Sequence, residues 1–297
     1  MGLINVLIIG SKGLIGSSIL KNLDYSVYRV YQTSRYPKGP ELFCDVLDYK
    51  SILKCFELVN PSIVINTSNL SGGVNFCEEN EIESYNFHFK SNTDIGSLCI
   101  KYNSTFVFIS TDYVFDGLNN KPVSENDKLN PLNIYGKHKL FAENWIKKHI
   151  KKHIIARTTN VYGWDPKTKT PNFLMHLFFN LSKNKNVTIP SYLYGNPTYA
   201  YTLAQSIIEL LSKKIYGTFH LVGDSYVSRY NWALEFCKLF NFDKNLINKV
   251  SNPPKNDIPR PLKSNLKNNK YKKYCDTRLL SLEEGLKLFK IDATFSK

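Results

Sequence analysis

Short apolar runs alternate with amphipathic stretches through the first half of this chain. Five apolar runs are expected to form buried strands, at residues 5–9, 27–32, 62–66, 105–110 and 153–157. The stretches between them have a helical pattern, which predicts helices at residues 14–23, 49–58, 82–102 and 134–149. Repeated strand–helix alternation is typical of a parallel sheet covered by helices on both faces. The sequence therefore predicts an α/β fold with a Rossmann-type, doubly wound parallel sheet.

From about Tyr162 the alternation becomes less regular. A polar loop is expected at residues 163–171, followed by a helix at 172–183 and a turn-rich stretch. A helix at 200–213 and a strand at 217–222 are expected to return to the sheet. The second half therefore predicts a smaller, discontinuous lobe beside the sheet.

Length and residue usage exclude several classes of protein. The 297 residues fit one large α/β domain or a Rossmann domain with a smaller lobe. No apolar run approaches the ~18 residues of a membrane span, and the first predicted strand begins at once, so neither a membrane span nor a signal peptide is expected. The six cysteines and six histidines show no metal-ligand spacing. We therefore expect a cytoplasmic protein with reduced thiols and no metal site.

The formal net charge of +14 could indicate a nucleic-acid-binding protein. However, only six of the 39 basic residues are arginines, and the lysines are dispersed in a chain rich in Asn, Ile and Tyr. That profile indicates the codon bias of an AT-rich genome more than a binding surface. The lysine-rich run at residues 263–273 is expected to be a solvated loop, and no nucleic acid partner is expected.

A glycine-rich turn follows the first predicted strand and opens the first predicted helix. It reads Gly10-Ser11-Lys12-Gly13-Leu14-Ile15-Gly16. Glycines at such a turn let a pyrophosphate approach closely, and the helix N-terminus presents free N–H groups to it. The spacing is G-x-x-G-x-x-G, which differs from the common dinucleotide fingerprint, and the alternative is a purely structural turn. The turn predicts a dinucleotide cofactor.

The end of the second predicted strand bears on which cofactor is used. It reads Thr33-Ser34-Arg35 and carries no acidic residue. NAD sites usually place a carboxylate there for the ribose 2′-hydroxyl, whereas an arginine suits a 2′-phosphate. This favours NADPH, with NADH as the second option. The alternative is that Arg35 is a solvated loop residue.

The candidate chemistry lies at Thr111, Tyr135 and Lys139. Tyr135 and Lys139 are four residues apart and share one face of a helix. A nearby ammonium lowers the pKa of a phenol, which makes Tyr135 a candidate general acid. Thr111 ends a buried strand, where ligands bind in open α/β sheets, and could donate a hydrogen bond to a carbonyl. The alternatives are a packed core aromatic, a solvated lysine and a strand-end cap.

These residues together resemble the extended short-chain dehydrogenase/reductase superfamily, and within it the dTDP-4-dehydrorhamnose reductase family. The resemblance spans about residues 4–290. It is carried by Ser110-Thr111-Asp112-Tyr113-Val114-Phe115-Asp116-Gly117, Pro131-Leu132-Asn133-Ile134-Tyr135-Gly136-Lys137-His138-Lys139, Arg157-Thr158, Val161-Tyr162-Gly163, Asn172-Phe173, Gly195-Asn196-Pro197-Thr198, Gly217-Thr218-Phe219-His220-Leu221 and Arg260-Pro261.

The resemblance implies an NADPH-dependent reductase of a nucleotide-linked 4-keto-6-deoxysugar, of the dTDP- or UDP-4-dehydrorhamnose type. It implies a Rossmann domain of residues 1–160 plus about 199–222, and a substrate-binding lobe of 161–198 and 223–297. The resemblance is also compatible with a homodimer.

The resemblance also assigns roles to individual residues. Lys139 would hold the nicotinamide ribose. The cofactor would also contact Asp45 and Val46 on the adenine side, and Thr67 and Ser68 after the strand at 62–66. Asn86 matches an asparagine that the superfamily uses to position water or backbone. His138 is expected to face solvent.

The sequence departs from the family at the sugar pocket. Asn160 stands where a Trp is often found, and Tyr192 and Leu193 lie where a D-Q pair is usual. These changes leave the sugar open. Tyr113 stands where related dehydratases have a second carboxylate and bifunctional 3,5-epimerase/4-reductases have a cysteine.

Two alternatives therefore stay open. One is a bifunctional epimerase/reductase of the same pathway. The other is a non-catalytic, NADP-binding subunit similar to the regulatory subunit of methionine adenosyltransferase.

Overall fold

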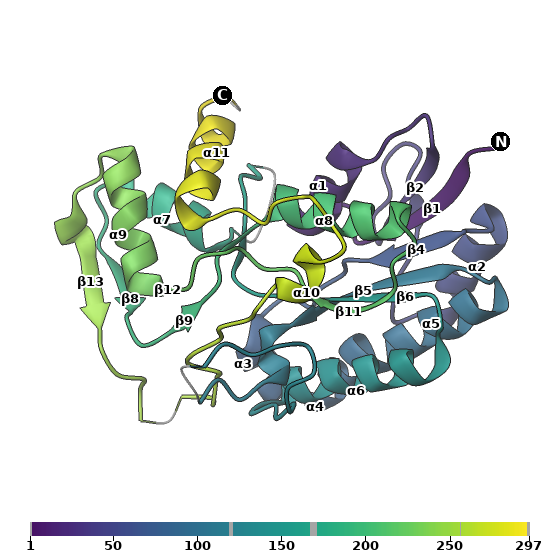
Figure 1. Ribbon diagram of the computed structural model, residues 1–297, viewed down its shortest axis with the longest axis horizontal. Coiled ribbons are helices and arrows are strands. Elements are labelled where there is room, and N and C mark those ends of the chain that lie inside the picture. The colour runs from purple at the N-terminus through teal and green to yellow at the C-terminus, as the bar shows by residue number, and fades with distance from the viewer. Residues whose placement is uncertain (1, 119–120, 167–170, 256, 296–297) are drawn as a thin grey trace.

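A seven-stranded, all-parallel sheet forms the larger part of the molecule (Figure 1). The computed structural model describes residues 2–118, 121–166, 171–255 and 257–295. The strand order is β11-β6-β5-β4-β1-β2-β3. The strands are β1 (Ile4–Ile9), β2 (Tyr28–Ser34), β3 (Leu42–Phe43), β4 (Ile63–Asn66), β5 (Thr105–Thr111), β6 (His153–Thr158) and β11 (Gly217–His220). The predicted Rossmann-type sheet is confirmed, and all six strands expected in it are present.

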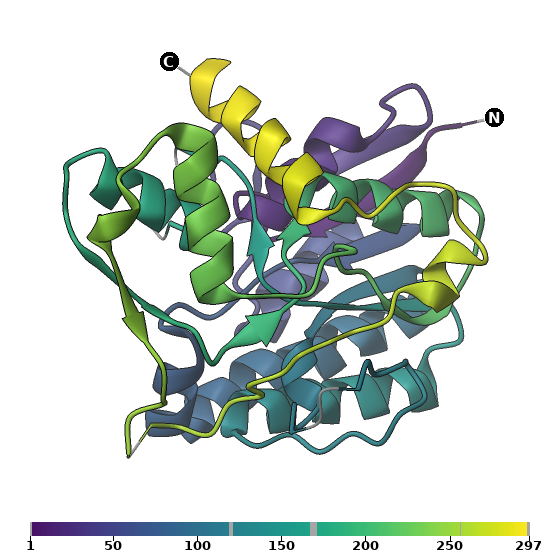
Figure 2. The same cartoon turned by 60° about the vertical axis from the view of Figure 1, so that its left-hand side comes forward.

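Helices cover both faces of this sheet because its strands are apolar on both sides. In β1, Val6 and Ile8 pack into one core, while Leu7 and Ile9 pack into the other. The helices α1 (Leu14–Asn22) and α8 (Ala200–Ser212) lie on the first face. The opposite face carries α2 (Tyr49–Val59), α5 (Ser91–Lys101) and α6 (Ile134–His149), as Figures 1 and 2 show.

The expected helix at residues 82–102 is in fact three consecutive pieces. They are α4 (Glu81–Tyr85), a π-helical turn (Asn86–Lys90) and α5. The preceding helix, α3 (Gly73–Glu79), was not predicted. A π-helical turn rotates the residues that follow it, and such turns are frequent at functional sites.

The smaller lobe has its own aromatic core. It is built from α7 (Phe173–Leu181), β8 (Val187–Pro190), α9 (Arg229–Phe240), β13 (Ile247–Val250) and α11 (Leu282–Phe295). Trp232, Phe236 and Phe289 are among its fully buried side chains. Two further strand pairs, β7 (Val161–Tyr162) with β10 (Thr198–Tyr199) and β9 (Tyr194–Gly195) with β12 (Val227–Ser228), lie between this lobe and the sheet. In the part of the chain that follows β6, α7, α8 and the sheet strand β11 were predicted, whereas the other elements were not.

An extended segment, residues 257–268, runs from the smaller lobe back across the larger domain to α10 (Asn269–Lys272), as Figure 2 shows. We call it the return strap. The backbone N–H of Lys263 donates to the carbonyl of Gly117 at 3.1 Å, and Leu266 pairs with Val123. The expectation of a solvated loop at 263–273 is wrong, because Leu266 and Tyr271 are buried.

The domain boundaries stay a prediction, although Tyr271, Cys275 and Leu279 pack into the sheet core. Residues 167–170 of the expected polar loop lie outside the described residues. In the described ranges, no helix is both long and apolar enough for a membrane crossing. All six cysteines are buried free thiols.

Candidate active site

The glycine-rich turn packs against the loop that follows β4. Gly10 has a positive φ of 80°, and a Cβ there would lie 2.7 Å from the backbone nitrogen of Ser68. Gly16 lies inside α1, where a Cβ would lie 2.5 Å from the carbonyl oxygen of Gly10. Gly13 caps α1 without a side-chain hydrogen bond, so the first N–H groups of the helix are free of a side-chain cap. The turn therefore offers N–H groups in the way that an anion site requires.

A cleft beside this turn gathers most of the predicted cofactor residues. Its lining includes Gly10, Lys12, Gly13, Leu14, Ile15, Arg35, Val46, Thr67 and Ser68. Gly16 and Asp45 are not part of the lining. The carboxylate of Asp45 instead accepts a hydrogen bond from the N–H of Leu47 at 3.0 Å, in the turn before α2.

Two cationic side chains, Lys12 and Arg35, line the cleft, and only Lys12 is in an ion pair among the described residues. Lys12 forms an ion pair with Glu41 at 2.7 Å and donates to the carbonyl of Tyr36 at 3.1 Å. Arg35 is exposed, and within the described part of the chain it has no ion pair. The guanidinium is therefore available to an anion, whereas the ammonium of Lys12 is already neutralised.

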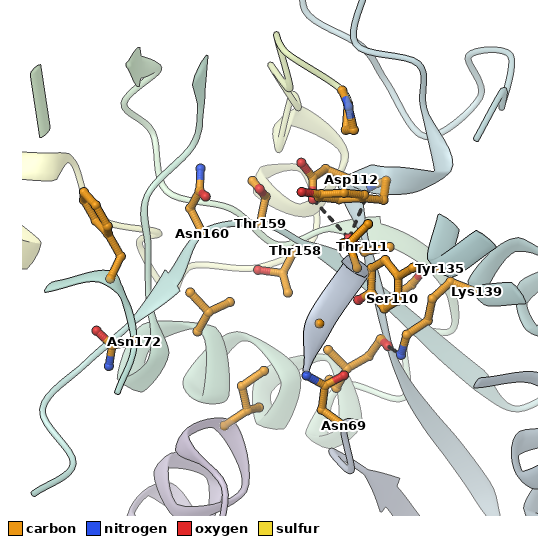
Figure 3. A pocket seen from close by; sticks show the side chains of 18 of the residues that line it. Asn69, Ser110, Thr111, Asp112, Tyr135, Lys139, Thr158, Thr159, Asn160 and Asn172 are labelled. Carbon is orange, nitrogen blue, oxygen red and sulfur yellow. Dashed lines mark hydrogen bonds between the residues drawn. The ribbon is translucent and has the colours of Figure 1, made fainter. Parts of the chain in front are cut away.

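A second pocket adjoins the cleft and shares Ile15, Thr67 and Ser68 with it. It lies at the carboxyl ends of β4, β5 and β6. Thr111, Tyr135 and Lys139 all line it, so the structure brings the three predicted residues together (Figure 3). Figure 3 also shows Thr158, Thr159 and Asn160 at the end of β6, between Asn172 on one side and Tyr135 on the other.

The start of α6 fixes Tyr135 in place. The Asn133 side chain caps the helix by accepting from the N–H of Gly136 at 2.9 Å. The carboxylate of Glu78 accepts from the N–H of Ile134 at 2.9 Å. Both bonds satisfy amides that the helix itself leaves unpaired. The residue before Tyr135 and the residue after it are therefore both anchored.

Burial raises the pKa of Tyr135, while a hydrogen bond with Thr111 acts in the opposite direction. Lys139 donates from Nζ to the carbonyl of Ile109 at 2.9 Å, and its Nζ lies 6.0 Å from the centre of the Tyr135 ring. Burial lowers the pKa of Lys139 to about 8. The expected lowering of the pKa of Tyr135 is not met, because loss of solvation raises that pKa. Tyr135 is consequently a protonated acid at neutral pH.

Thr111 has two neighbours besides Tyr135. Its hydroxyl accepts from the N–H of Tyr113 at 3.2 Å and lies 3.1 Å from the carboxylate of Asp112, to which it donates. It therefore caps the strand end, as the alternative reading held, and lines the pocket as well. Tyr113 meets the Tyr135 ring edge-on, with centroids 5.6 Å apart. Burial raises the pKa of Tyr113.

His88 is a pocket residue that the sequence analysis missed. It is 1 % exposed, and among the described residues its Nδ1 has no hydrogen-bond partner. The π-helical turn directs His88 into the pocket, while Asn86 lines a separate hollow beside Val46. The expected asparagine is therefore not at this site. The register shift of a π-helical turn leaves no mark in the residue pattern, so no sequence signal identified His88.

His138 does not face solvent. It is 3 % exposed, and its Nδ1 lies 2.9 Å from the hydroxyl oxygen of Ser84. The expectation was wrong because α4 packs over this side of α6.

A buried ion pair joins α6 to β6 one turn beyond Lys139. Arg157 donates to both oxygens of Glu143, from Nε at 2.9 Å and from Nη2 at 2.6 Å. Ser110 donates to the same carboxylate at 2.6 Å. Such a paired and hydrogen-bonded charge fixes the helix relative to β5 and β6.

The far wall of the pocket comes from the smaller lobe. Its lining includes Asn172, Phe173, Leu193, Tyr194, Arg229 and Trp232. Tyr192, which was expected in this region, is not part of the lining. No group of three or more His, Cys, Asp or Glu side chains is placed to hold a metal ion within the described ranges.

Comparisons with known proteins extend over nearly the whole chain. A family model described as "RmlD substrate binding domain" matches residues 4–294. The spore coat polysaccharide biosynthesis protein SpsK of Bacillus subtilis is 28% identical over 261 residues, covering 86% of each chain. Methionine adenosyltransferase 2 subunit beta of Rattus norvegicus is 23% identical over 270 residues, covering 88% of this chain and 79% of the relative.

Two solved structures have closely similar folds. A dTDP-4-dehydrorhamnose reductase from Clostridium acetobutylicum has a TM-score of 0.87 at 28% identity, covering 98% of this chain and 100% of that one. A dTDP-4-dehydrorhamnose reductase from Bacillus anthracis, solved in complex with NADP, has a TM-score of 0.87 at 24% identity with the same coverage.

Proposed function

Because the chain belongs to the RmlD substrate binding domain family, we propose that it is an NADPH-dependent reductase of a nucleotide-linked 4-keto-6-deoxysugar. The substrate is of the dTDP- or UDP-4-dehydrorhamnose type. The observation that carries the proposal is the convergence of Thr111, Tyr135 and Lys139 in one pocket that adjoins the glycine-rich cleft. The Clostridium acetobutylicum relative is itself a dTDP-4-dehydrorhamnose reductase.

The residues of the cleft fit a dinucleotide. The N–H groups at the start of α1 would hold its pyrophosphate, close to Gly10 and Gly13. Arg35 would bind a 2′-phosphate. Thr67 and Ser68 line both the cleft and the pocket, so they would lie beside the middle of the cofactor. When bound, the nicotinamide would supply the hydride.

The chain's own residues would orient the ketone and supply the proton. The hydroxyl of Thr111 would rotate its hydrogen from Asp112 to the carbonyl oxygen of the substrate. Tyr135 would deliver its phenolic proton to the same oxygen as charge develops there. Burial of the phenol supports this role, because it keeps the proton on Tyr135 until an oxyanion forms nearby. Lys139 holds the ribose hydroxyls and remains a cation close to the phenol.

NADPH is proposed over NADH for two reasons. Arg35 is available at the rim of the cleft, and the carboxylate nearest to it in the chain, Glu41, is engaged by Lys12. The Bacillus anthracis relative binds NADP. A carboxylate free to hold the 2′-hydroxyl of NADH is lacking at the end of β2.

The reaction proposed is reduction without epimerisation. Removing a proton from sugar C3 or C5 needs a base near the substrate. Tyr113 stands where bifunctional relatives have a cysteine, and burial against Tyr135 makes its phenolate costly. A separate epimerase would therefore be needed for a rhamnose-type product. The bifunctional enzyme is the alternative.

The non-catalytic alternative rests on the similarity to methionine adenosyltransferase 2 subunit beta. One assay separates the possibilities. The protein is mixed with NADPH and dTDP- or UDP-4-keto-6-deoxyglucose, with and without a 3,5-epimerase, and absorbance at 340 nm is followed. Turnover that depends on the epimerase supports the proposal. Turnover without it supports the bifunctional enzyme only if the product formed in D₂O carries deuterium at C3 or C5. NADPH binding without turnover under any condition supports the binding subunit.

A further inference from the structure

Arg229 places a cation in the wall of the substrate pocket. It is the first residue of α9, and the pocket that it lines also contains Thr111 and Tyr135. Its Nη2 donates to the side-chain oxygen of Asn160 at 2.8 Å. Its guanidinium lies 5.1 Å from the centre of the Phe173 ring.

None of these contacts neutralises the charge. Asn160 is a neutral amide, and in the described ranges Arg229 forms no ion pair. Burial lowers the pKa of Arg229, and the nearest groups that act in the opposite direction are Tyr113 and Asp112. Burial also raises the pKa of Asp112, so that carboxyl is a poor counter-ion. Arg229 is partly buried, and a partly buried cation without a counter-ion costs free energy unless something else supplies the anion.

Two other arginines, Arg157 and Arg260, have a carboxylate as ion-pair partner. Arg157 is fully buried and bound by both oxygens of Glu143. Arg260, on the return strap, lies 3.9 Å from Asp257 and also hydrogen-bonds to Asn75. Arg229 differs from both because its remaining donors lie in a wall of the open pocket.

Two other polar atoms from residues that line the same pocket have no hydrogen-bond partner among the described residues. Trp232 follows Arg229 by three residues on α9, and its buried indole N–H has no partner among the described atoms. The hydroxyl of Thr158, at the end of β6, is buried and equally without a partner there. Buried polar groups are normally hydrogen-bonded, so orphaned ones around a pocket indicate a bound polar ligand.

We propose that Arg229, held by Asn160, is an oxyanion-binding site of the substrate pocket and selects for an anionic group on the ligand. The inference rests on the proposed function for its ligand class, a nucleoside diphosphate sugar. On the 6-deoxysugar nucleotide proposed above, the diphosphate presents the required chemistry, and on another sugar of this ligand class a carboxylate would present it. The five N–H donors of a guanidinium suit either one in a two-pronged geometry.

The test measures binding rather than turnover, so that it stands apart from the proposed reaction. Three probes are titrated into the NADP⁺-saturated protein by calorimetry: a nucleoside diphosphate, its glucose conjugate and its glucuronate conjugate. The thymidine or uridine series is used, whichever binds the wild type more tightly. Arg229→Gln removes the charge, and Arg278→Gln, an exposed arginine outside the pocket, is the matched control.

We expect Arg229→Gln to weaken binding about 10- to 100-fold, the range for a hydrogen bond to a charged group. An equal loss for all three probes identifies the diphosphate as the bound oxyanion, and a loss confined to the glucuronate conjugate identifies the carboxylate. Affinity for NADP⁺ should not change.

The inference is overturned if Arg229→Gln binds every probe like the wild type, if Arg278→Gln loses as much, or if the wild type binds none of them. If thermal melting shows that Arg229→Gln does not fold, Arg229→Lys replaces it. That variant keeps the charge but not the fork of donors, and an unchanged affinity in it would equally overturn the inference. A protein that passes this test but does not oxidise NADPH would retain the oxyanion site and lose the proposed reaction.

Discussion

The ring of His88 meets the ring of Tyr135 edge-on, with their centroids 5.0 Å apart. Burial lowers the pKa of His88 to about 2, with the charge of Lys139 acting in the same direction. His88 is therefore neutral throughout the range in which enzymes are assayed. His88 contributes its neutral ring to the pocket wall, and its Nδ1 has no partner among the described residues. Any titration near Tyr135 in this pH range therefore belongs to another group.

The pH dependence of the reductase should reflect Lys139. Burial lowers the pKa of Lys139 to about 8. The protonated form of Lys139 is the one that would bind the ribose and lie as a cation beside the phenol of Tyr135. We therefore expect kcat to fall as pH rises through about 8. No step should appear near pH 6.5, where an ordinary histidine titrates. Lys139→Arg, which stays charged, should lose the alkaline fall. A wild-type kcat that stays constant to pH 9.5 would contradict the assignment.

Tyr135→Phe should lower kcat by at least ~10²-fold, the low end for general acid catalysis. The substitution keeps the ring that packs against His88 and Tyr113, so affinity for NADPH should change little. Steady-state kinetics with a 4-keto sugar nucleotide measures the first effect, and calorimetry measures the second. Tyr274→Phe, at an exposed tyrosine, is the matched control. Wild-type turnover in Tyr135→Phe would remove this residue from the mechanism.

Arg35→Ala should weaken NADPH binding and leave NADH binding nearly unchanged. The reason is that only NADPH carries the 2′-phosphate that Arg35 would bind. A loss of ~10-fold or more is expected for one charged contact. Arg29→Ala provides a matched control, because Arg29 lies exposed on β2 and away from the cleft. Equal losses for both cofactors would point to a structural role for Arg35.

Deuterium incorporation tests the monofunctional reading. In D₂O the purified protein should leave C3 and C5 of dTDP-4-keto-6-deoxyglucose unlabelled, because Tyr113 is a buried phenol and an unperturbed phenol is already a weaker acid than a thiol by roughly 1.5 pK units. Mass spectrometry of the recovered sugar provides the measurement. Label at either carbon without an added epimerase would favour the bifunctional enzyme.

Glu143→Gln should destabilise the fold by about 3–5 kcal/mol, since it leaves Arg157 charged and buried without its counter-ion. Burial by itself raises the pKa of Glu143, but the hydrogen bond and the charge of Arg157 outweigh it, so the pKa is lower than normal. The stabilisation is therefore present above the unfolded pKa near ~4.3 and is lost as pH falls through the folded value.

Urea unfolding at pH 7 and at lower pH measures this effect. The difference between the wild type and Glu143→Gln should shrink as the solution becomes acidic. Glu283→Gln, which breaks an exposed pair with Lys287, should leave the unfolding midpoint nearly unchanged. A Glu143→Gln variant as stable as that control would show that the buried pair contributes little.

The sequence predicted best what depends on local pattern. The bounds of α6 match the predicted helix at residues 134–149, and the helix begins directly after its capping residue, Asn133. The parallel sheet followed from strand–helix alternation in the same way. Each predicted element is a short, continuous run of residues, and the alternation is the repetition of such runs along the first half of the chain.

Features that depend on distant contacts were missed. Arg229 and Asn160 are 69 positions apart and meet only because α9 packs beside the end of β6. The direction of His88 depends on a single π-helical turn, which moved the inward position away from Asn86. The pKa of Tyr135 depends on desolvation by the whole pocket rather than on its i+4 lysine. No local pattern records any of the three.

Because the return strap lies near the end of the chain, the ribosome synthesises it after most of the residues that line the site. The carbonyl of Pro259 accepts from the side chain of Asn133, the cap of the helix that carries Tyr135, across 126 positions of chain. Leu266 donates its N–H to Asn196 beside the end of β9. On the ribosome, all seven strands of the sheet emerge before this segment, and Tyr271, Cys275 and Leu279 of the sheet core emerge after it. Non-local closure of this kind is slow. The strap can therefore close the pocket only after the residues of the cofactor cleft have all been synthesised.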